Sequence, residues 1–310
     1  MIDFSQFDKV FGPMSLFAYN RTVTLSIEAS RRSLEGSLFI DRVLKALKLG
    51  QATNCYPPKN EAALRELHQH ICDSDNINLH HKLSIIYYLL LDIDGRSSDG
   101  DSKADSFASL AGIPQRYQVF MKGLWLLDTR NFELALEHLT HPALISDFTD
   151  EILVALVRHA KDDDYTLALS YYHTVQPNIQ SSAALQALFE AIARSSVIGG
   201  FDFSRSHADY MRRSLFQNLV AVVLDAEPDE DRASRAYELT SLPFDADEER
   251  WFREYLESGE GKKLKAAKDT LVMRRIATGH GGYGITGGDK GGWATVLEGF
   301  RTGSGGRTPA

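Results

Sequence analysis

The chain has 310 residues, 43% of them hydrophobic and 25% charged, which is the balance of a protein with a sizeable buried core. Its 34 Lys and Arg face 42 Asp and Glu, and a net charge of −8 argues against general affinity for nucleic acid. Cys55 and Cys72 lie in unrelated contexts and offer neither a disulfide framework nor a metal-binding pattern. The N-terminus lacks a secretory signal, and the most apolar run, residues 85–91, is too short to span a bilayer. We therefore expect an intracellular protein.

Apolar residues recur with the helical period through most of the chain, and the alternation typical of strands is nearly absent. The first 35 residues are ambiguous, because they include a stretch at 23–27 that could be extended. Helices are expected over 37–49, after Asn60 as the N-terminal cap, and over 78–94. The last of these is apolar nearly all round, which predicts a central position. Residues 94–106, rich in Gly, Ser and Asp, are expected to form a surface loop.

The stretch FELALEHL is echoed further along the chain by YTLALSYY. Phe132 matches Tyr165 and Ala135 matches Ala168, and Ala236 follows after about two further periods of roughly 34 residues. A small residue where two helices cross, with an aromatic residue three positions earlier, is typical of stacked helical hairpins. The tetratricopeptide set of Trp, Leu, Gly and Tyr is absent. The sequence therefore predicts an all-α fold, an irregular α-helical repeat of the α-solenoid type.

Composition divides the chain into four predicted parts: an N-terminal segment (1–35) that packs on the domain, the helical domain (36–258), a basic helical segment (259–278) and a flexible glycine-rich tail (279–310). The basic segment is either a solvated helix face or a contact for an acidic partner or nucleic acid. The apolar cluster within the tail either docks on a partner or folds back on its own domain. The candidate partner-binding residues are Lys262, Lys263, Lys265, Arg274, Arg275, Trp293, Leu297 and Phe300.

The sequence contains no recognisable catalytic arrangement. The histidines are scattered without a metal-ligand spacing, and the glycine-rich GHGGYG lacks the strand and helix that a phosphate-binding loop needs. Acidic clusters such as KDDD and DADEER fall at helix starts, where the helix dipole accounts for them. We expect no enzyme, no bound metal and no cofactor.

Residues 113–156 resemble the helical domain of the ELYS family of nuclear pore assembly proteins. The resemblance rests on GLWLLD at 123–128, on Leu139 and on the His141–Pro142 pair. GLWLLD is expected to be a fold signature, with the side chain of Trp125 packed inside. The signature residues are Trp125, Leu126, Leu127, Asp128, Phe132, Ala135 and Pro142.

This resemblance implies a structural nucleoporin, located at the nuclear pore complex in the nuclear envelope, that associates with the outer-ring Y-shaped complex. The implied partners are a WD-repeat propeller nucleoporin and its helical scaffold neighbour. The animal long form adds a propeller and a chromatin-binding region with an AT-hook. The chain shows neither, so scaffold attachment carries over, and direct DNA binding is not expected. The alternative is a helical-repeat adaptor outside the pore, similar to tetratricopeptide or proteasome-lid proteins.

Overall fold

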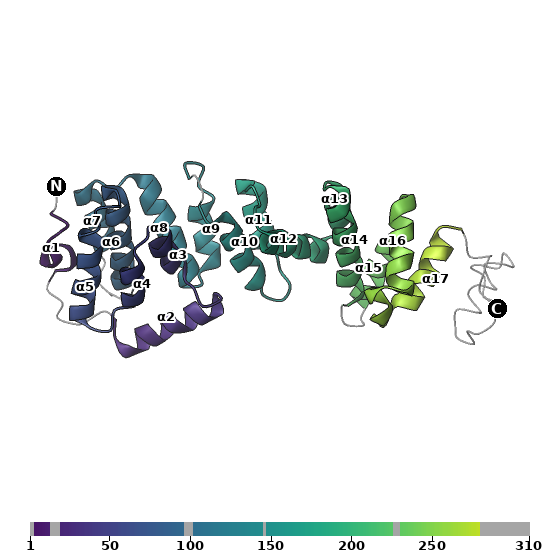
Figure 1. Cartoon of the computed structure of the whole chain (residues 1–310), viewed down its shortest axis with the longest axis horizontal. Coiled ribbons are helices and arrows are strands. Elements are labelled where there is room, and N and C mark those ends of the chain that lie inside the picture. Colours follow the sequence, from purple (N-terminus) through teal and green to yellow (C-terminus); the bar gives the residue numbers. More distant parts are fainter. Residues whose placement is uncertain (1–2, 13–18, 96–101, 145–146, 226–229, 280–310) are drawn as a thin grey trace, which may run out of the picture. The chain divides into compact units, whose positions relative to one another are not determined.

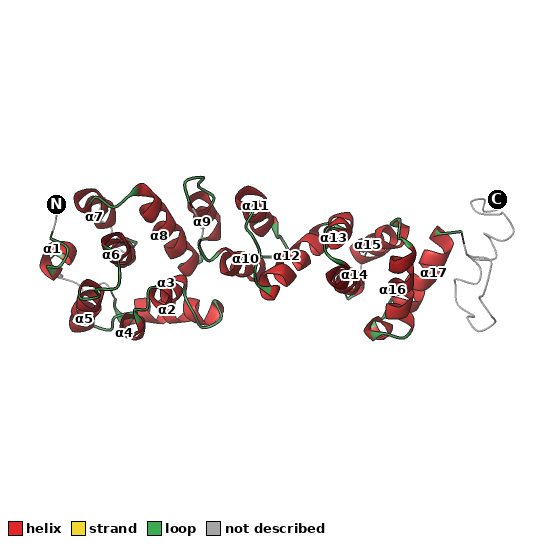
Figure 2. Ribbon diagram, turned by 45° about the horizontal axis from the view of Figure 1, so that its top comes forward, coloured by secondary structure: helices red, strands yellow, loops and turns green. Residues whose placement is uncertain are grey.

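The computed structural model describes residues 3–12, 19–95, 102–144, 147–225 and 230–279. Every regular element in these ranges is a helix, which confirms the predicted all-α class (Figure 1, Figure 2). None of the described helices combines the length and the apolar character that crossing a bilayer requires. The stacking of the helices into a solenoid stays a prediction, and the predicted flexible tail from residue 280 onward lies outside the described residues.

The chain divides into two compact units. The predicted helical domain at 36–258 stays a prediction. The described residues of the N-terminal unit fall within 3–159 and 166–180, and those of the C-terminal unit fall within 160–165 and 181–279. The helices of the N-terminal unit are α1 (Phe7–Phe11), α2 (Arg21–Ser33), α3 (Phe39–Ala46), α4 (Gly50–Cys55), α5 (Glu61–Cys72), α6 (Leu79–Asp94), α7 (Lys103–Ala111), α8 (Gln115–Asp128), α9 (Phe132–Leu139), α10 (Thr149–Arg158) and α11 (Thr166–Val175). Those of the C-terminal unit are α12 (Ser182–Ser195), α13 (Val197–Arg205), α14 (Asp209–Leu224), α15 (Glu230–Ser241), α16 (Ala246–Glu257), the 3₁₀-helix η1 (Glu260–Lys263) and α17 (Ala267–Ala277).

Helix α6 forms the centre of the N-terminal unit, as its all-round apolar sequence predicts. Every residue from Leu83 to Ile93 is buried. The helix packs against α5, α7 and α8, which surround it (Figure 1). Asn60 and Asn78 cap α5 and α6, and each side chain accepts a hydrogen bond from the backbone N–H three residues later.

The structure resolves one ambiguity of the sequence and narrows one predicted loop. The stretch at 23–27 is not extended but lies within α2, whose first turn is capped by the Asn20 side chain. The predicted loop at 94–106 is shorter than expected, because α6 continues to Asp94 and α7 begins at Lys103. The Asp94 carboxylate accepts from the backbone N–H of Ala104 at 2.7 Å and from the Ser102 hydroxyl at 2.8 Å. The Ser102 side chain caps α7 by accepting from the backbone N–H of Asp105, and the carboxylate of Asp94 on the preceding helix adds a second acceptor at the start of α7.

The predicted echo corresponds to two successive helical hairpins. Helices α8 and α9 begin at Gln115 and Phe132, and α10 and α11 begin at Thr149 and Thr166, so both pairs keep the predicted spacing. The alanines at 135, 168 and 236 are all buried, as expected for small residues on a packed helix face.

Helix α9 packs tightly against α8 at a glycine. A Cβ atom added to Gly123 would lie 2.7 Å from Cγ and Cδ2 of Leu139, a distance that packed carbon atoms do not tolerate. Leu139 is itself buried, so its side chain has no open space into which it could turn. The first residue of GLWLLD is thus glycine because α9 occupies the space where a side chain would lie.

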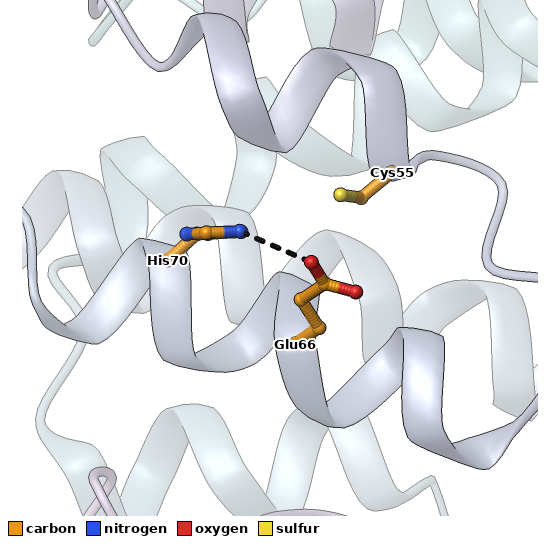
Figure 3. A group of neighbouring side chains, drawn as sticks. All are labelled: Cys55, Glu66 and His70. Atoms are coloured by element: carbon orange, nitrogen blue, oxygen red, sulfur yellow. Dashed lines mark ion pairs between the residues drawn. The ribbon is translucent and has the colours of Figure 1, made fainter.

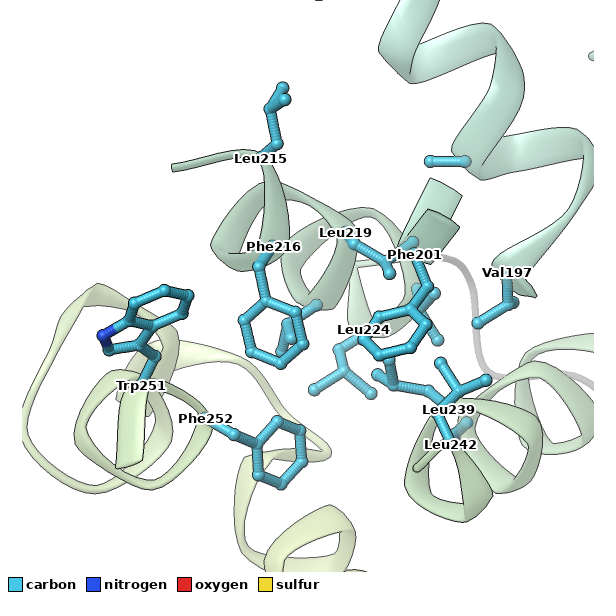
Figure 4. Packing of buried hydrophobic residues seen from close by; sticks show 14 of the residues in the cluster. Val197, Phe201, Leu215, Phe216, Leu219, Leu224, Leu239, Leu242, Trp251 and Phe252 are labelled. Atoms are coloured by element: carbon cyan, nitrogen blue, oxygen red, sulfur yellow. The ribbon is translucent and has the colours of Figure 1, made fainter. Parts of the chain in front are cut away.

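The C-terminal unit has a core of its own, in which the rings of Phe216 and Phe252 are almost fully buried (Figure 4). Helices α12 to α16 contribute to it, and so does Ala267 at the start of α17. Helix α17 packs against α15 and α16. The residues predicted as a separate basic segment at 259–278 are therefore built into this unit.

We predict that Gly123→Ala destabilises the chain by about 1–2 kcal/mol, because overpacking against Leu139 outweighs the higher helix propensity of alanine. Gly50→Ala is the matched control, since a Cβ at Gly50 meets nothing within 4 Å. It is expected to be neutral or slightly stabilising. Urea denaturation followed by circular dichroism measures both, and equal midpoints for the two variants would contradict the close approach.

Candidate interaction site

The last residue of GLWLLD, Asp128, holds three parts of the N-terminal unit together. Its carboxylate accepts from the backbone N–H groups of Phe39 at 2.7 Å and Ile40 at 3.0 Å, which open α3. It also accepts from the Tyr88 hydroxyl on α6 at 2.8 Å. Leu38, the residue before α3, has no side-chain acceptor of its own. Asp128 on α8 therefore serves as the cap of a helix that begins 89 residues earlier.

Trp125 is half-buried and connects the same motif to a second buried carboxylate. Its indole Nε1–H donates to Asp92 on α6 at 2.8 Å. Asp92 also accepts from the hydroxyls of Tyr19 at 2.9 Å and Tyr56 at 2.7 Å. A buried carboxylate is tolerated when its lone pairs are filled in this way. GLWLLD thus supplies the hydrogen-bond donor for one buried acid, Asp92, and contains the second buried acid, Asp128.

Burial determines how Asp128 titrates. Removal from water raises the pKa of Asp128 to about 7, although the hydrogen bonds from Phe39, Tyr88 and Ile40 oppose the rise. Burial also raises the pKa of Tyr88 well above its ordinary value, so its hydroxyl stays protonated and remains a donor.

The other signature residues divide between the interior and the surface. Leu126, Leu127 and Ala135 are buried. Phe132 is half-buried against the ring of His159, with 5.2 Å between ring centroids, and Pro142 is exposed. The sequence motif gave no sign of the Asp92 cluster, since its members come from distant positions.

The HPAL stretch after α9 borders an apolar groove of about 370 Å³ within the N-terminal unit. Ala143 and Leu144 line one side, and Phe120 and Met121 on α8 line another. Parts of α3 and α6 complete the wall, and the ionisable groups in the lining are His81, Arg116 and Asp147. The size is within the range of small-ligand pockets and can equally accept apolar side chains of another protein. The sequence at 141–144 does not predict a groove at this place.

Arginines of the C-terminal unit hold its helices together from within. Glu248 on α16 is fully buried and accepts from Arg205 through both carboxylate oxygens, at 2.9 and 2.6 Å, and from Arg212. Burial alone would raise the pKa of Glu248, but the hydrogen bonds from Arg205 and Arg212 outweigh it and hold the pKa below its ordinary value. Asp245 and Glu248 together form the capping box of α16.

Arg274, a predicted partner-binding residue, is also internal, and that prediction is corrected. Its side chain is buried and donates to the carbonyls of Thr240 at 2.7 Å and Leu242 at 2.6 Å. It pairs with Glu249 and lies over the ring of Phe244, 4.0 Å from the centroid. A guanidinium with all these partners fixes the turn between α15 and α16 and is not available to another protein.

The remaining basic candidates are at the surface. Lys262, Lys263 and Lys265 on η1 and just after it are exposed, and no acidic side chain among the described residues forms an ion pair with them. Arg275 is half-exposed and lies 3.4 Å from a carboxylate oxygen of Glu257. Trp293, Leu297 and Phe300 lie outside the described residues. We call the three lysines the basic face, and their role in binding stays a prediction.

The fold and these surfaces define an all-α protein with two helical units, an apolar groove and a basic face. The family model described as ELYS, nuclear pore complex assembly, matches residues 37–259. The chain therefore belongs to the ELYS family. Membership of this family points to the nucleus and the nuclear pore as the place of action and to a role in pore assembly.

Three curated relatives share this region. The chain is 24% identical over 227 residues to the uncharacterized protein ely5 of Schizosaccharomyces pombe, covering 71% of this chain and 72% of the relative. It is 24% identical over 222 residues to Protein ELYS of Homo sapiens, covering 70% of this chain and 9% of that protein. Protein ELYS of Xenopus laevis is 26% identical over 161 residues, which are 50% of this chain and 6% of the relative. The chain thus spans less than a tenth of either vertebrate protein.

We predict that Asp128→Asn removes part of the pH dependence of stability. In the unfolded chain an aspartate titrates near pH 4, whereas Asp128 in the folded chain has a pKa of about 7. The folded state therefore binds the extra proton between these values, and this contribution is complete below about pH 4 and is lost as the pH rises to about 7. The wild type should lose on the order of 3–4 kcal/mol relative to the variant over this interval. Urea denaturation at several pH values measures the difference, and a pH-independent difference would disprove the raised pKa.

Arg274→Met and Arg275→Met form a matched pair on adjacent positions of α17. Arg274→Met should lower the unfolding free energy by about 3–5 kcal/mol, because it removes the hydrogen-bond donor of Glu249 and of the two carbonyls at Thr240 and Leu242. The exposed pair made by Arg275 should be worth less than about 1 kcal/mol. Thermal and urea denaturation compare the two, and similar losses would show that the Arg274 contacts are not structural.

Proposed function

We propose that the chain is a non-enzymatic scaffold protein that attaches to the outer-ring Y-shaped complex of the nuclear pore. The observation that carries this proposal is the match to the ELYS family over residues 37–259, on an all-α fold. The polar groups buried in the two units also support it. Asp92, Asp128 and Glu248 each bind donors from other helices and hold the fold together. Their arrangement accounts for them structurally and leaves no need for a catalytic role.

The attachment is made by the basic face together with the tail that follows α17. Three lysines within four positions give a local positive charge on a chain of net charge −8. Such a patch favours an acidic surface of a partner and speeds association with it. The partners are a WD-repeat propeller nucleoporin and its helical scaffold neighbour. In the tail, Trp293, Leu297 and Phe300 supply apolar side chains of the kind that dominate interface energies.

The test must leave the C-terminal unit intact. A truncation near Lys262 would remove α17, and with it Ala267 from the core and Arg274 from its partners. Truncation after Gly279 removes the tail and spares α17. The triple variant Lys262→Glu, Lys263→Glu and Lys265→Glu reverses the basic face without touching a buried group.

We predict that each of these changes weakens binding to the purified partner nucleoporins at least tenfold. The lysine reversal should leave the melting temperature within about 2 °C, since it changes only exposed side chains. The matched control is the triple reversal of three other exposed lysines, Lys59, Lys103 and Lys161, which should bind like wild type. Calorimetry or pull-down measures binding. Unchanged binding of both test variants would refute attachment through this end of the chain.

The alternative is a helical adaptor that acts outside the pore. A tagged full chain decides between the two, because a pore scaffold gives a signal at the nuclear rim and co-purifies with outer-ring nucleoporins. A diffuse signal together with other co-purified proteins would favour the adaptor.

A further inference from the structure

Helices α4 and α5 bring a thiol, a carboxylate and an imidazole together on one side of the N-terminal unit (Figure 3). Cys55 is the last residue of α4, and Glu66 and His70 are one turn apart on α5. The ligand atoms of the three side chains all lie within 4.8 Å of one another. Glu66 Oε1 and His70 Nε2 are already 3.7 Å apart.

These three side chains are a donor set suited to zinc. Zn²⁺ binds thiolate sulfur at about 2.3 Å and imidazole nitrogen or carboxylate oxygen at about 2.0–2.2 Å. In a tetrahedral site these bond lengths place neighbouring ligand atoms roughly 3.3–3.8 Å apart. The Glu66–His70 separation already falls in this range. The Cys55 sulfur has to move by about 1 Å at most, a shift that side-chain rotation can supply.

A second Cys–His pair, Cys72 and His68, lies entirely on α5 and has a structural role. His68 is buried, its Nε2 lies 2.8 Å from the Phe4 carbonyl oxygen, and its ring packs edge-on against Phe7. The Cys72 sulfur lies 3.5 Å from the same nitrogen. This pair therefore holds the segment around α1 against α5. Cys55 and His70 are only half-buried, and Glu66 is exposed, so their side chains are free to rearrange around an ion.

We propose that Cys55, Glu66 and His70 bind one Zn²⁺ ion, with a water molecule as the fourth ligand, and that the ion fastens α4 to α5. On binding, the Cys55 thiol releases its proton to solvent and its sulfur forms a bond to the metal, with no change of oxidation state. Neutral His70 donates the lone pair of Nε2, and Glu66 donates through one carboxylate oxygen. The ion neutralises the two negative charges that this arrangement brings together.

A bound cation has to overcome the electrostatics of the metal-free site. Burial and the negative charge of Glu66 raise the pKa of the Cys55 thiol, so without a cation the cysteine is a poor nucleophile. A divalent cation between the two groups reverses this effect, because it favours the thiolate. Binding should therefore weaken as the pH falls and should release protons.

The experiment uses the untagged full chain, kept reduced and freed of metal, and titrates it with Co²⁺ and Cd²⁺ as spectroscopic probes. A thiolate-to-metal charge-transfer band should grow in the ultraviolet and saturate at one equivalent. Zn²⁺ should displace the probe and raise the melting temperature. Cys55→Ser and His70→Gln should each weaken binding at least tenfold, and Cys55→Ser should also remove the charge-transfer band.

Cys72→Ser is the matched control, because it removes the chain's other cysteine, which lies on α5 with Glu66 and His70, and it should keep the band and the affinity. Circular dichroism of each variant verifies that the helices are intact. The proposal is overturned if no band saturates at one equivalent, if the band survives in Cys55→Ser, or if Cys72→Ser abolishes it. None of these outcomes depends on attachment to the nuclear pore, so this test stands apart from that of the proposed function.

Discussion

The carboxylate of Asp128 is the contact on which the N-terminal unit depends. Helix α3 begins after Leu38, which has no side-chain acceptor, so the first N–H groups of the helix need an acceptor from elsewhere. Asp128 supplies it and binds Tyr88 of the central helix at the same time. A buried polar group without a hydrogen-bond partner destabilises the fold by more free energy than a satisfied one contributes. Loss of Asp128 would leave both the first N–H groups of α3 and the Tyr88 hydroxyl without this acceptor. Three helices therefore share one acid.

The C-terminal unit solves a similar problem with paired charges. Buried Glu248 is matched by two arginines, and buried Arg274 by Glu249 and two carbonyls, so each buried charge meets an opposite one. The pKa of Glu248 consequently falls, whereas that of Asp128, whose described partners are neutral donors, rises. Arginine suits this task because its planar guanidinium donates several hydrogen bonds in fixed directions. The lysines at 262, 263 and 265 have no such partners in the described structure. The buried arginines therefore stabilise the fold, whereas these lysines remain at the surface.

The helical period predicted the fold class, the central position of α6 and the spacing of the two hairpins, because these features depend on residues close in sequence. The predictions that differ from the structure concern mainly features that depend on more distant residues. The start of α7 combines the local cap Ser102 with Asp94 from the preceding helix, so its position could have been read from the serine. The internal role of Arg274 depends on Thr240 and Leu242, which are too distant in the sequence to be recognised from a local pattern. The Cys55–Glu66–His70 cluster was missed for the same reason, since only the spacing of Glu66 and His70 is visible in one helix and Cys55 comes from another.

The unrepeated stretches that point to the ELYS family have two physical roles. GLWLLD acts inward: Gly123 admits α9, Trp125 binds Asp92, and Asp128 caps α3. HPAL acts at the surface, where Ala143 and Leu144 line the groove. A family signature of this kind records the requirements of folding and of contact together. A substitution in GLWLLD that abolished attachment to a partner would therefore be explained first by loss of the fold. Evidence about the interface has to come from surface positions such as the basic face, where a side chain can be changed while the buried carboxylates keep all their partners.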